Sequence, residues 1–135
     1  MYKAEVEHRN DVIFDVKLGN SQLTIDAKGK EGVTPLDILL ASLASCAGVY
    51  IRKYAEGVRL DFGGFLVTAE AELSKESPFS FKSIQLSVDL KGVRFDERRK
   101  KALQEFIKNC PVHNTLKGNP EIAIAIREDK EQNGD

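Results

Sequence analysis

The 135-residue chain is poor in several residue types that would point to a function at once. It has no tryptophan, one methionine, two histidines and two cysteines. Two cysteines do not make the disulfide framework of a small secreted protein, although they leave a transient disulfide open. A net charge of −1 provides no basic surface of the kind that binds nucleic acid or anionic membranes. These shortages exclude disulfide scaffolds and argue against nucleic-acid partners.

A long hydrophobic run is also missing. The longest, residues 38–51, has 14 positions and is bounded by Asp37 and Arg52, whereas a membrane span needs about 20. The first residues lack the basic, apolar and small-residue regions of a signal peptide. We therefore expect a cytoplasmic protein with no membrane partner, folded as one domain over residues 1–127. Residues 128–135 are charged and almost without apolar side chains, so we expect a disordered tail.

Alternation of apolar and polar residues predicts antiparallel strands at both ends of the chain. Turn residues separate the first three runs, which indicates a meander with short loops. Two further runs follow the middle of the chain, and one more precedes the tail. The predicted strands cover residues 2–8, 12–18, 23–27, 65–73, 81–90 and 121–127.

The most apolar stretch, residues 34–57, lies between these strands and predicts a long helix. Thr34 can cap it, Pro35 suits its first position, Asp37 can close a capping box, and Gly57 can end it. Apolar side chains cover nearly every side of such a helix, which predicts burial all round. One sheet of a small domain covers one face only. We therefore expect a second copy of the chain to cover the rest, in a homodimer.

Two shorter helices are predicted in the last third of the chain. Asp96 begins an amphipathic helix, and a short helix runs from Pro111 to Gly118. The predicted order is three strands, a long helix, two strands, a helix, a short helix and a strand. This order indicates the α+β class.

Cys46 lies in the middle of the long predicted helix. A thiol is a nucleophile only as a thiolate, and burial alone would raise its pKa. On its own helix face, Ser42 and Tyr50 could hydrogen-bond a thiolate, whereas Lys53 is nearly two turns away. An activating charge would therefore come from another segment or another subunit. A small core residue and a thiol placed for chemistry are both open readings of Cys46.

Cys110 stands at the junction of the two shorter helices. As the N-cap of a helix that begins at Pro111, it would have a lowered thiol pKa; alternatively it is the last apolar residue of the preceding helix. With His113 it forms C-x-x-H, which could be half of a zinc site. Only Cys46 and His8 remain as further ligands of that kind, so we expect no metal. His113 could instead be a base for a cysteine nucleophile or a solvated surface residue.

The two cysteine motifs together resemble those of the OsmC/Ohr family (osmotically inducible protein C and organic hydroperoxide resistance proteins). The family's central-helix motif is similar to TPLDILLASLASC, in which Pro35 stands eleven residues before Cys46. Its second-cysteine motif resembles CPVHNTL, from Cys110 to Leu116. The 64 positions between the cysteines and the order of elements also agree, so the resemblance extends to about residue 127.

This resemblance implies an intertwined homodimer in which antiparallel sheets wrap around long central helices. It also implies a thiol-dependent peroxidase in which Cys46 attacks an organic hydroperoxide and becomes a sulfenic acid. Cys110 would then form a Cys46–Cys110 disulfide, and a dithiol reductant, a dihydrolipoyl protein in some members, would reduce it. No cofactor is implied.

One position departs from the peroxidase pattern. Peroxidases of the family carry a glutamate directly after the motif proline, and it helps to hold an activating arginine. Here that position is Leu36, and the nearest acid is Asp37, as in a neighbouring branch of the family. Arg9 is the arginine of the N-terminal strands and takes the activating role by resemblance. The departure leaves open an alternative, an OsmC-fold dimer for redox sensing or ligand binding with weak or no turnover.

Overall fold

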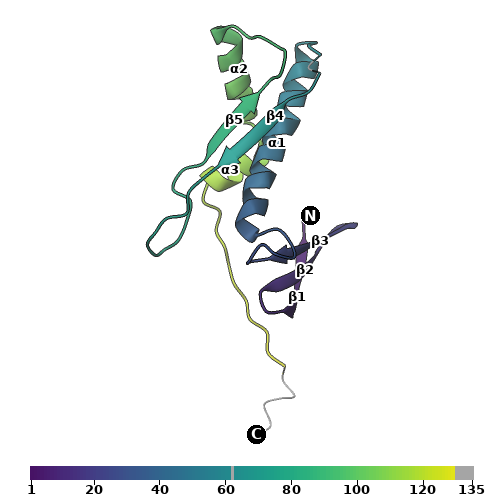
Figure 1. The fold of residues 1–135 in the computed structure, drawn as a ribbon, viewed down its shortest axis with the longest axis vertical. Coiled ribbons are helices and arrows are strands. Elements are labelled where there is room, and N and C mark those ends of the chain that lie inside the picture. Colours follow the sequence, from purple (N-terminus) through teal and green to yellow (C-terminus); the bar gives the residue numbers. More distant parts are fainter. Residues whose placement is uncertain (62, 130–135) are drawn as a thin grey trace.

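A computed structural model of the chain describes residues 1–61 and 63–129, and its elements are arranged along one long helix (Figure 1). Strands and helices follow each other in the predicted order up to the last helix. The fold is α+β, and both of its sheets are antiparallel. The elements are β1 Ala4–Asn10, β2 Ile13–Leu18, β3 Ser21–Asp26, α1 Pro35–Gly57, β4 Leu66–Glu70, β5 Gln85–Asp89, α2 Glu97–Ile107 and α3 Pro111–Lys117.

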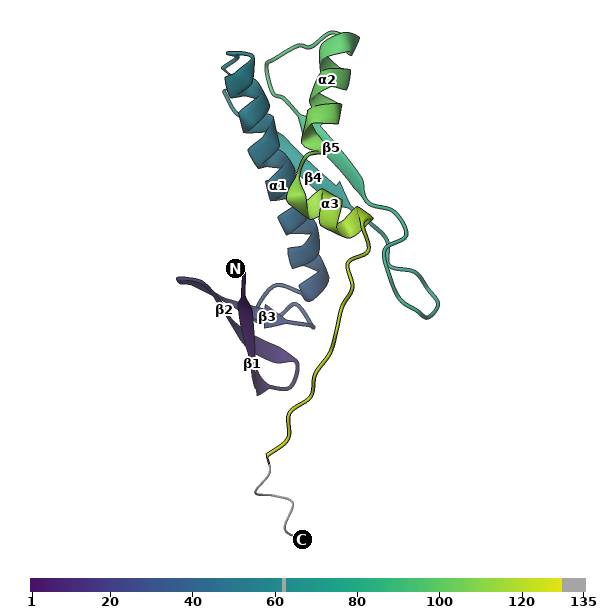
Figure 2. The same cartoon turned by 180° about the vertical axis from the view of Figure 1, so that it is seen from behind.

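The first sheet is the predicted meander, with strand order β1-β2-β3, and it lies at the N-terminal end of α1 (Figures 1 and 2). Val16 pairs with Val6 on one side and with Leu23 on the other. The register of β1 and β2 shifts between His8 and Asn10, which places Arg9 in a bulge. Bulges commonly redirect a side chain away from the regular ladder.

A tight loop connects this sheet to α1 and depends on one buried carboxylate. Asp26 is 2% exposed, and its side chain accepts hydrogen bonds from the backbone N–H groups of Lys28, Lys30 and Glu31 at 2.9, 3.2 and 3.0 Å. These N–H donors, that of Glu31 first, hold the pKa of Asp26 below its usual value. The loop therefore delivers the chain to the first turn of α1 in a defined direction.

Both ends of α1 are where the sequence predicts them. The Thr34 hydroxyl accepts a hydrogen bond from the backbone N–H of Asp37 at 3.2 Å, Pro35 is the first helical residue and Gly57 the last. At 23 residues, α1 is long and apolar enough to cross a membrane, which its 14-residue uninterrupted run did not suggest. The core helix of a soluble protein passes the same test, and α1 packs against β4, α2 and α3.

The prediction that α1 is buried on every side is not met within one chain. The buried residues form a single stripe with a spacing of four. Leu36 and Val49, off that stripe, are 40% and 51% exposed. The domain is too small to bury the whole helix, because the sheet and the two shorter helices can cover only one side of α1. The residues of the stripe are Leu43, Ala47, Ile51 and Ala55.

The central core forms where α1 meets α2 and the second sheet. Ile51, Ala55 and Leu103 are the buried centre of this cluster, and side chains of β4 and β5 pack around them. The helix predicted to begin at Asp96 is α2, and Asp96 caps it, since its carboxylate accepts a hydrogen bond from the Arg99 backbone N–H at 2.8 Å. The core thus holds α2, and with it the start of α3, against the middle of α1.

The predicted last strand, residues 121–127, is wrong for the single chain. This segment has no regular secondary structure and runs away from the fold as an extended arm after α3 (Figures 1 and 2). Ile122, Ile124 and Ile126 lie 81%, 84% and 86% exposed on it. A strand exists only where a sheet edge pairs with it, and alternation in the sequence does not supply that edge. The predicted disordered tail falls, from residue 130 on, outside the described residues.

Candidate functional site

The fold brings together the two cysteines, which lie 64 positions apart in the sequence. Cys46 is on the middle of α1, and Cys110 directly precedes α3, which packs against α1. Both are free thiols; Cys46 is half-buried and Cys110 is 0% exposed. The two side chains are close enough for the Cys46 thiol to contribute to raising the pKa of Cys110. The site therefore contains two neighbouring thiols in different environments.

Cys110 is both the N-cap of α3 and a core residue. Its sulfur accepts a hydrogen bond from the backbone N–H of His113 at 3.4 Å, as the N-cap prediction requires. Burial raises the pKa of the Cys110 thiol, and the hydrogen bond with Cys46 raises it further, while the N–H groups of His113 and Val112 act in the opposite direction. The net direction is upward. The expected lowering of this pKa by the helix start is thus wrong, because desolvation outweighs two N–H donors.

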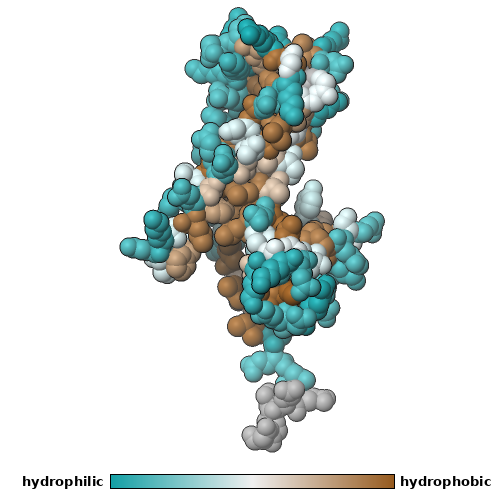
Figure 3. All heavy atoms as spheres, viewed as in Figure 1, coloured by the Kyte–Doolittle hydropathy of each residue, from teal (hydrophilic) through white to brown (hydrophobic). Residues whose placement is uncertain are grey.

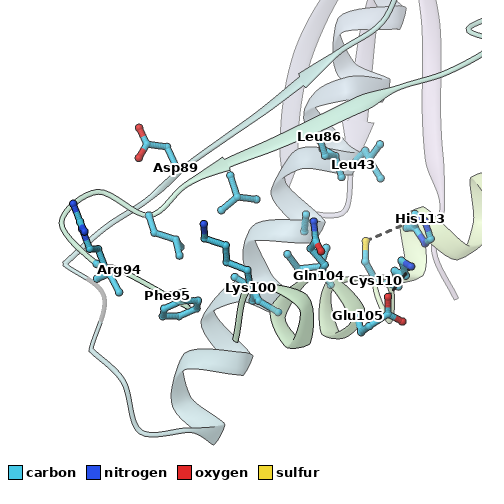
Figure 4. Close-up of a pocket in the computed structure, with 17 residues that line it drawn as sticks. Leu43, Leu86, Asp89, Arg94, Phe95, Lys100, Gln104, Glu105, Cys110 and His113 are labelled. Atoms are coloured by element: carbon cyan, nitrogen blue, oxygen red, sulfur yellow. Dashed lines mark hydrogen bonds and ion pairs between the residues drawn. The ribbon is translucent and has the colours of Figure 1, made fainter. Parts of the chain in front are cut away.

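A groove of about 920 Å³ opens beside Cys110, between α1, β5 and α2 (Figure 4). Its walls are largely apolar, and charged side chains from the end of β5 and from α2 stand along it. Cys110 and His113 lie at one end of it, whereas Cys46 is not among the described residues that line it. The end of the groove therefore lies against the buried Cys110, and Cys46 lies outside the lining. Apolar walls come from Leu43, Ala47, Leu86, Val88, Leu103 and Ile107.

Arg9 lies apart from the cysteines within one chain. Its guanidinium forms a two-contact ion pair with Asp15 of β2, with 3.2 Å from Nε to Oδ2, and reaches the Thr24 hydroxyl at 3.4 Å. The hydrogen bond with Asp15 raises the pKa of Arg9 and lowers that of Asp15. The sequence carries no signal that pairs Asp15 with Arg9, because their contact depends on the register of β1 and β2, which sets Asp15 opposite Glu7.

Asp37 does not reach the cysteines either. It is an exposed residue in the first turn of α1, and its backbone N–H completes the Thr34 cap. Nine residues of helix, about 13 Å of rise, separate it from Cys46. Within one chain, the structure thus brings together Cys46 and Cys110 from the predicted site residues, and it adds His113.

His113 is neither a zinc ligand in a formed site nor a fully solvated residue. Among residues 1–61 and 63–129, no three His, Cys, Asp or Glu side chains are grouped to hold a metal ion. The Nδ1 atom of His113 is buried and has no hydrogen-bond partner in that same part of the chain. An unpaired polar atom beside a buried thiol marks this end of the groove as a place for chemistry.

Comparison with known proteins gives a consistent match. The family model described as OsmC-like protein matches residues 27–125. A hydroperoxide reductase of Mycoplasma genitalium is 28% identical over 113 residues, which is 79% of this chain and 80% of that protein. The crystal structure of an OsmC-like protein from Mycoplasma pneumoniae has a TM-score of 0.75 at 24% identity, covering 87% of this chain and 88% of the other.

A further solved structure has the same fold. It is the organic hydroperoxide resistance protein OhrB of Bacillus subtilis, with a TM-score of 0.65 at 19% identity, covering 88% of this chain and 92% of the other. At these identities the structural matches establish the arrangement of elements.

Proposed function

The chain belongs to the OsmC-like protein family, whose model matches residues 27–125, and we propose that it is a thiol-dependent hydroperoxide reductase. The observation that carries this proposal is the meeting of Cys46 and Cys110, both as free thiols, on α1 and at the start of α3. Relatives named hydroperoxide reductase, in Mycoplasma genitalium and Mycoplasma pneumoniae, support the same assignment.

The two thiols differ in their exposure to solvent, as a two-step reaction requires. Cys46 is the more exposed, so a hydroperoxide reaches it first. The Cys46 thiolate attacks an oxygen of the hydroperoxide, the O–O bond breaks, and an alcohol leaves once it takes up a proton. Cys46 is then a sulfenic acid. Cys110, buried beside it, is held back from the peroxide and is positioned for the second step.

The second step closes a disulfide. The Cys110 sulfur attacks the Cys46 sulfur, the S–S bond forms, the S–O bond breaks and the oxygen leaves as water. A dithiol, for which a dihydrolipoyl protein is a suitable source, then exchanges with the disulfide and restores both thiols while it is itself oxidised. We place this cycle in the cytoplasm, where such reductants keep thiols reduced.

We propose that the working unit is a homodimer. A single chain leaves one side of α1 uncovered and carries an arm of three alternating exposed isoleucines. Figure 3 shows apolar side chains over the middle of the molecule and along this arm. Contiguous apolar surface of this kind in a soluble protein marks an interface. In the dimer, Arg9 of a second copy is our candidate for the charge that activates Cys46. Its ion pair with Asp15 would hold the guanidinium, a role that falls to a glutamate in the family's peroxidases, at the position that is Leu36 here.

The test is a count of thiols. Reduced protein treated with a small excess of an alkyl hydroperoxide should lose both thiols and form one disulfide within each chain. Cys110→Ser should stop at a sulfenic acid on Cys46, which dimedone traps for mass spectrometry. Cys46→Ser should keep its remaining thiol. Persistence of both thiols in the unmodified protein, with Cys46→Ser reacting no differently, would rule out the reductase.

The alternative function, a redox-sensing or ligand-binding dimer, is favoured by one observation, Leu36 at the position where peroxidases of the family have an acid. The two functions separate at the reduction step. A reductase turns over many equivalents of hydroperoxide when a dihydrolipoyl compound is supplied. A sensor forms the disulfide once and then consumes no further peroxide.

A further inference from the structure

His113 is a polar residue beside Cys110 that the cycle above does not use. Its Nδ1 atom is buried, and among the residues that the structure describes it has no hydrogen-bond partner. Buried polar atoms in proteins are almost always paired, and the exceptions are enriched at sites where a proton or ligand arrives during function. A role for Nδ1 is therefore to be sought in a later state of the site.

The position of His113 places it next to the Cys110 sulfur. It lies in the first turn of α3, and its backbone N–H donates to the Cys110 sulfur at 3.4 Å. Both residues line the same end of the groove, as Figure 4 shows. The ring and the thiol belong to a single helical turn, so a movement of α3 toward Cys46 carries both together.

The second step of the cycle requires a proton to leave the Cys110 thiol and another to reach the departing hydroxyl group. The attacking sulfur must lose its proton, and burial raises the pKa of that thiol, so little thiolate is present at neutral pH. The hydroxyl group on Cys46 must gain a proton to leave as water. A neutral imidazole can accept a proton at one nitrogen and return it, which no other uncharged side chain does near neutral pH.

Given the proposed reductase function, we propose that His113 transfers the proton of the Cys110 thiol to the hydroxyl group that leaves Cys46. The ring takes the proton at Nδ1 as the Cys110 sulfur attacks. The S–S bond forms and the S–O bond breaks. The ring then gives a proton to the departing oxygen, so water is released and the imidazole is neutral again. A turn of the ring or one water molecule joins Nδ1 to the sulfur, since the two are not bonded in the reduced protein.

Several charged side chains that line the groove are engaged in ion pairs, which leaves His113 as the group for this proton transfer. Glu105 of α2 and Lys108, the residue that caps the end of α2, face the same groove but pair with each other at 2.8 Å. Lys100, also on α2, pairs with Glu97 at 3.3 Å. The ring therefore stays available to accept the proton of the Cys110 thiol and to return it. The remaining charged residues of the groove are Asp89 and Arg94.

The experiment separates the two steps in time. One equivalent of cumene hydroperoxide is added to reduced protein at pH 7, the sulfenic acid is measured by dimedone trapping, and disulfide formation is followed by quenched thiol alkylation in H₂O and in D₂O. The variant is His113→Gln, which keeps a polar side chain without a transferable ring proton. The matched control is His8→Gln, which removes the only other histidine of the chain.

The expected result is specific to the second step. His113→Gln should form sulfenic acid at the rate of the unmodified protein but close the disulfide about 100-fold more slowly, within the usual range for general acid–base catalysis. It should also show a smaller solvent deuterium isotope effect on disulfide formation than the unmodified protein and His8→Gln, because proton transfer by the ring no longer takes part in that step. An unchanged second step in His113→Gln overturns the proposal.

Two further outcomes are distinguished from that one. If the unmodified protein forms neither sulfenic acid nor disulfide, the reductase function fails and not the role of His113. If His113→Gln does not fold, the unmodified protein decides alone. A disulfide rate that is the same in H₂O and D₂O overturns the role of His113.

Discussion

Two neighbouring positions on α1 should respond differently to truncation if a second copy covers the helix. Ile51 is 0% exposed in the single chain, whereas Val49, two residues earlier, is 51% exposed. Ile51→Ala removes buried atoms from the core formed with Ala55 and Leu103, and such changes cost about 2–5 kcal/mol of unfolding free energy. This loss of unfolding free energy arises inside each chain, so it does not depend on protein concentration.

Val49→Ala should act mainly through the dimer. It removes two carbon atoms, worth roughly 1.6 kcal/mol when fully buried at about 0.8 kcal/mol each. About half of that burial exists within one chain, and a symmetric interface counts the remaining half twice, so the dimer should lose about 1.6 kcal/mol. This corresponds to roughly a tenfold rise in the dimer dissociation constant.

The assay combines sedimentation with urea unfolding at two protein concentrations. Ile51→Ala should lower the unfolding midpoint at both, and Ile51→Val should do so by less, about 0.5–1.5 kcal/mol. Val49→Ala should shift the sedimentation isotherm to higher concentration. A folded monomer at micromolar concentration in the unmodified protein, or an isotherm that Val49→Ala leaves unmoved, refutes the reasoning.

Two other predictions concern the segment that leads into α1. Gly32→Ala should lower the urea midpoint strongly, because an added Cβ would lie 2.4 Å from the Thr24 carbonyl oxygen, whereas Gly57→Ala, with nothing within 4 Å, should be neutral or slightly stabilising. A Gly32→Ala protein as stable as Gly57→Ala would contradict this packing. Asp26→Asn should be less stable than the unmodified protein at pH 7. The pKa of Asp26 in the folded protein lies below 3.8, the ordinary value for an aspartate. The ionised carboxylate therefore stabilises the fold fully above pH 3.8, and this stabilisation is lost as the pH falls through the folded-state pKa. The urea midpoints of the two proteins should then converge in acid. A constant difference down to acid unfolding would be the contrary result.

The local features of the fold could be predicted because they depend on near neighbours in the chain. The cap at Thr34, the end of α1 at Gly57 and the capping of α2 by Asp96 each involve residues within one turn. The same holds for Cys110 as the N-cap of α3. The arm after α3 shows the limit of this reasoning. Alternating Ile122 and Ile124 are suited to a strand, but pairing requires a sheet edge from elsewhere, and one chain does not supply it.

The environment of the site also lay beyond local reasoning. The lowering expected for the pKa of Cys110 rested on N–H donors three residues away, but burial by α1 and α2 reverses the direction. The ion pair between Arg9 and Asp15 needed the register of β1 and β2. The burial of the His113 Nδ1 atom, which has no hydrogen-bond partner in residues 1–61 and 63–129, depends on the packing of α3 against α1.

By itself, the sequence determined the class of the fold, the order of elements through α3, and the two motifs that contain Cys46 and Cys110. Periodicity, caps and motif spacing are properties of neighbouring residues, so they can be read along the chain. Only the tertiary structure decided that the two thiols meet and that Cys110 is buried while Cys46 is half-buried. It also decided that the His113 Nδ1 atom, beside Cys110, is buried without a hydrogen-bond partner among the described residues. Burial and proximity depend on segments distant in sequence, and their free energies can outweigh the local ones.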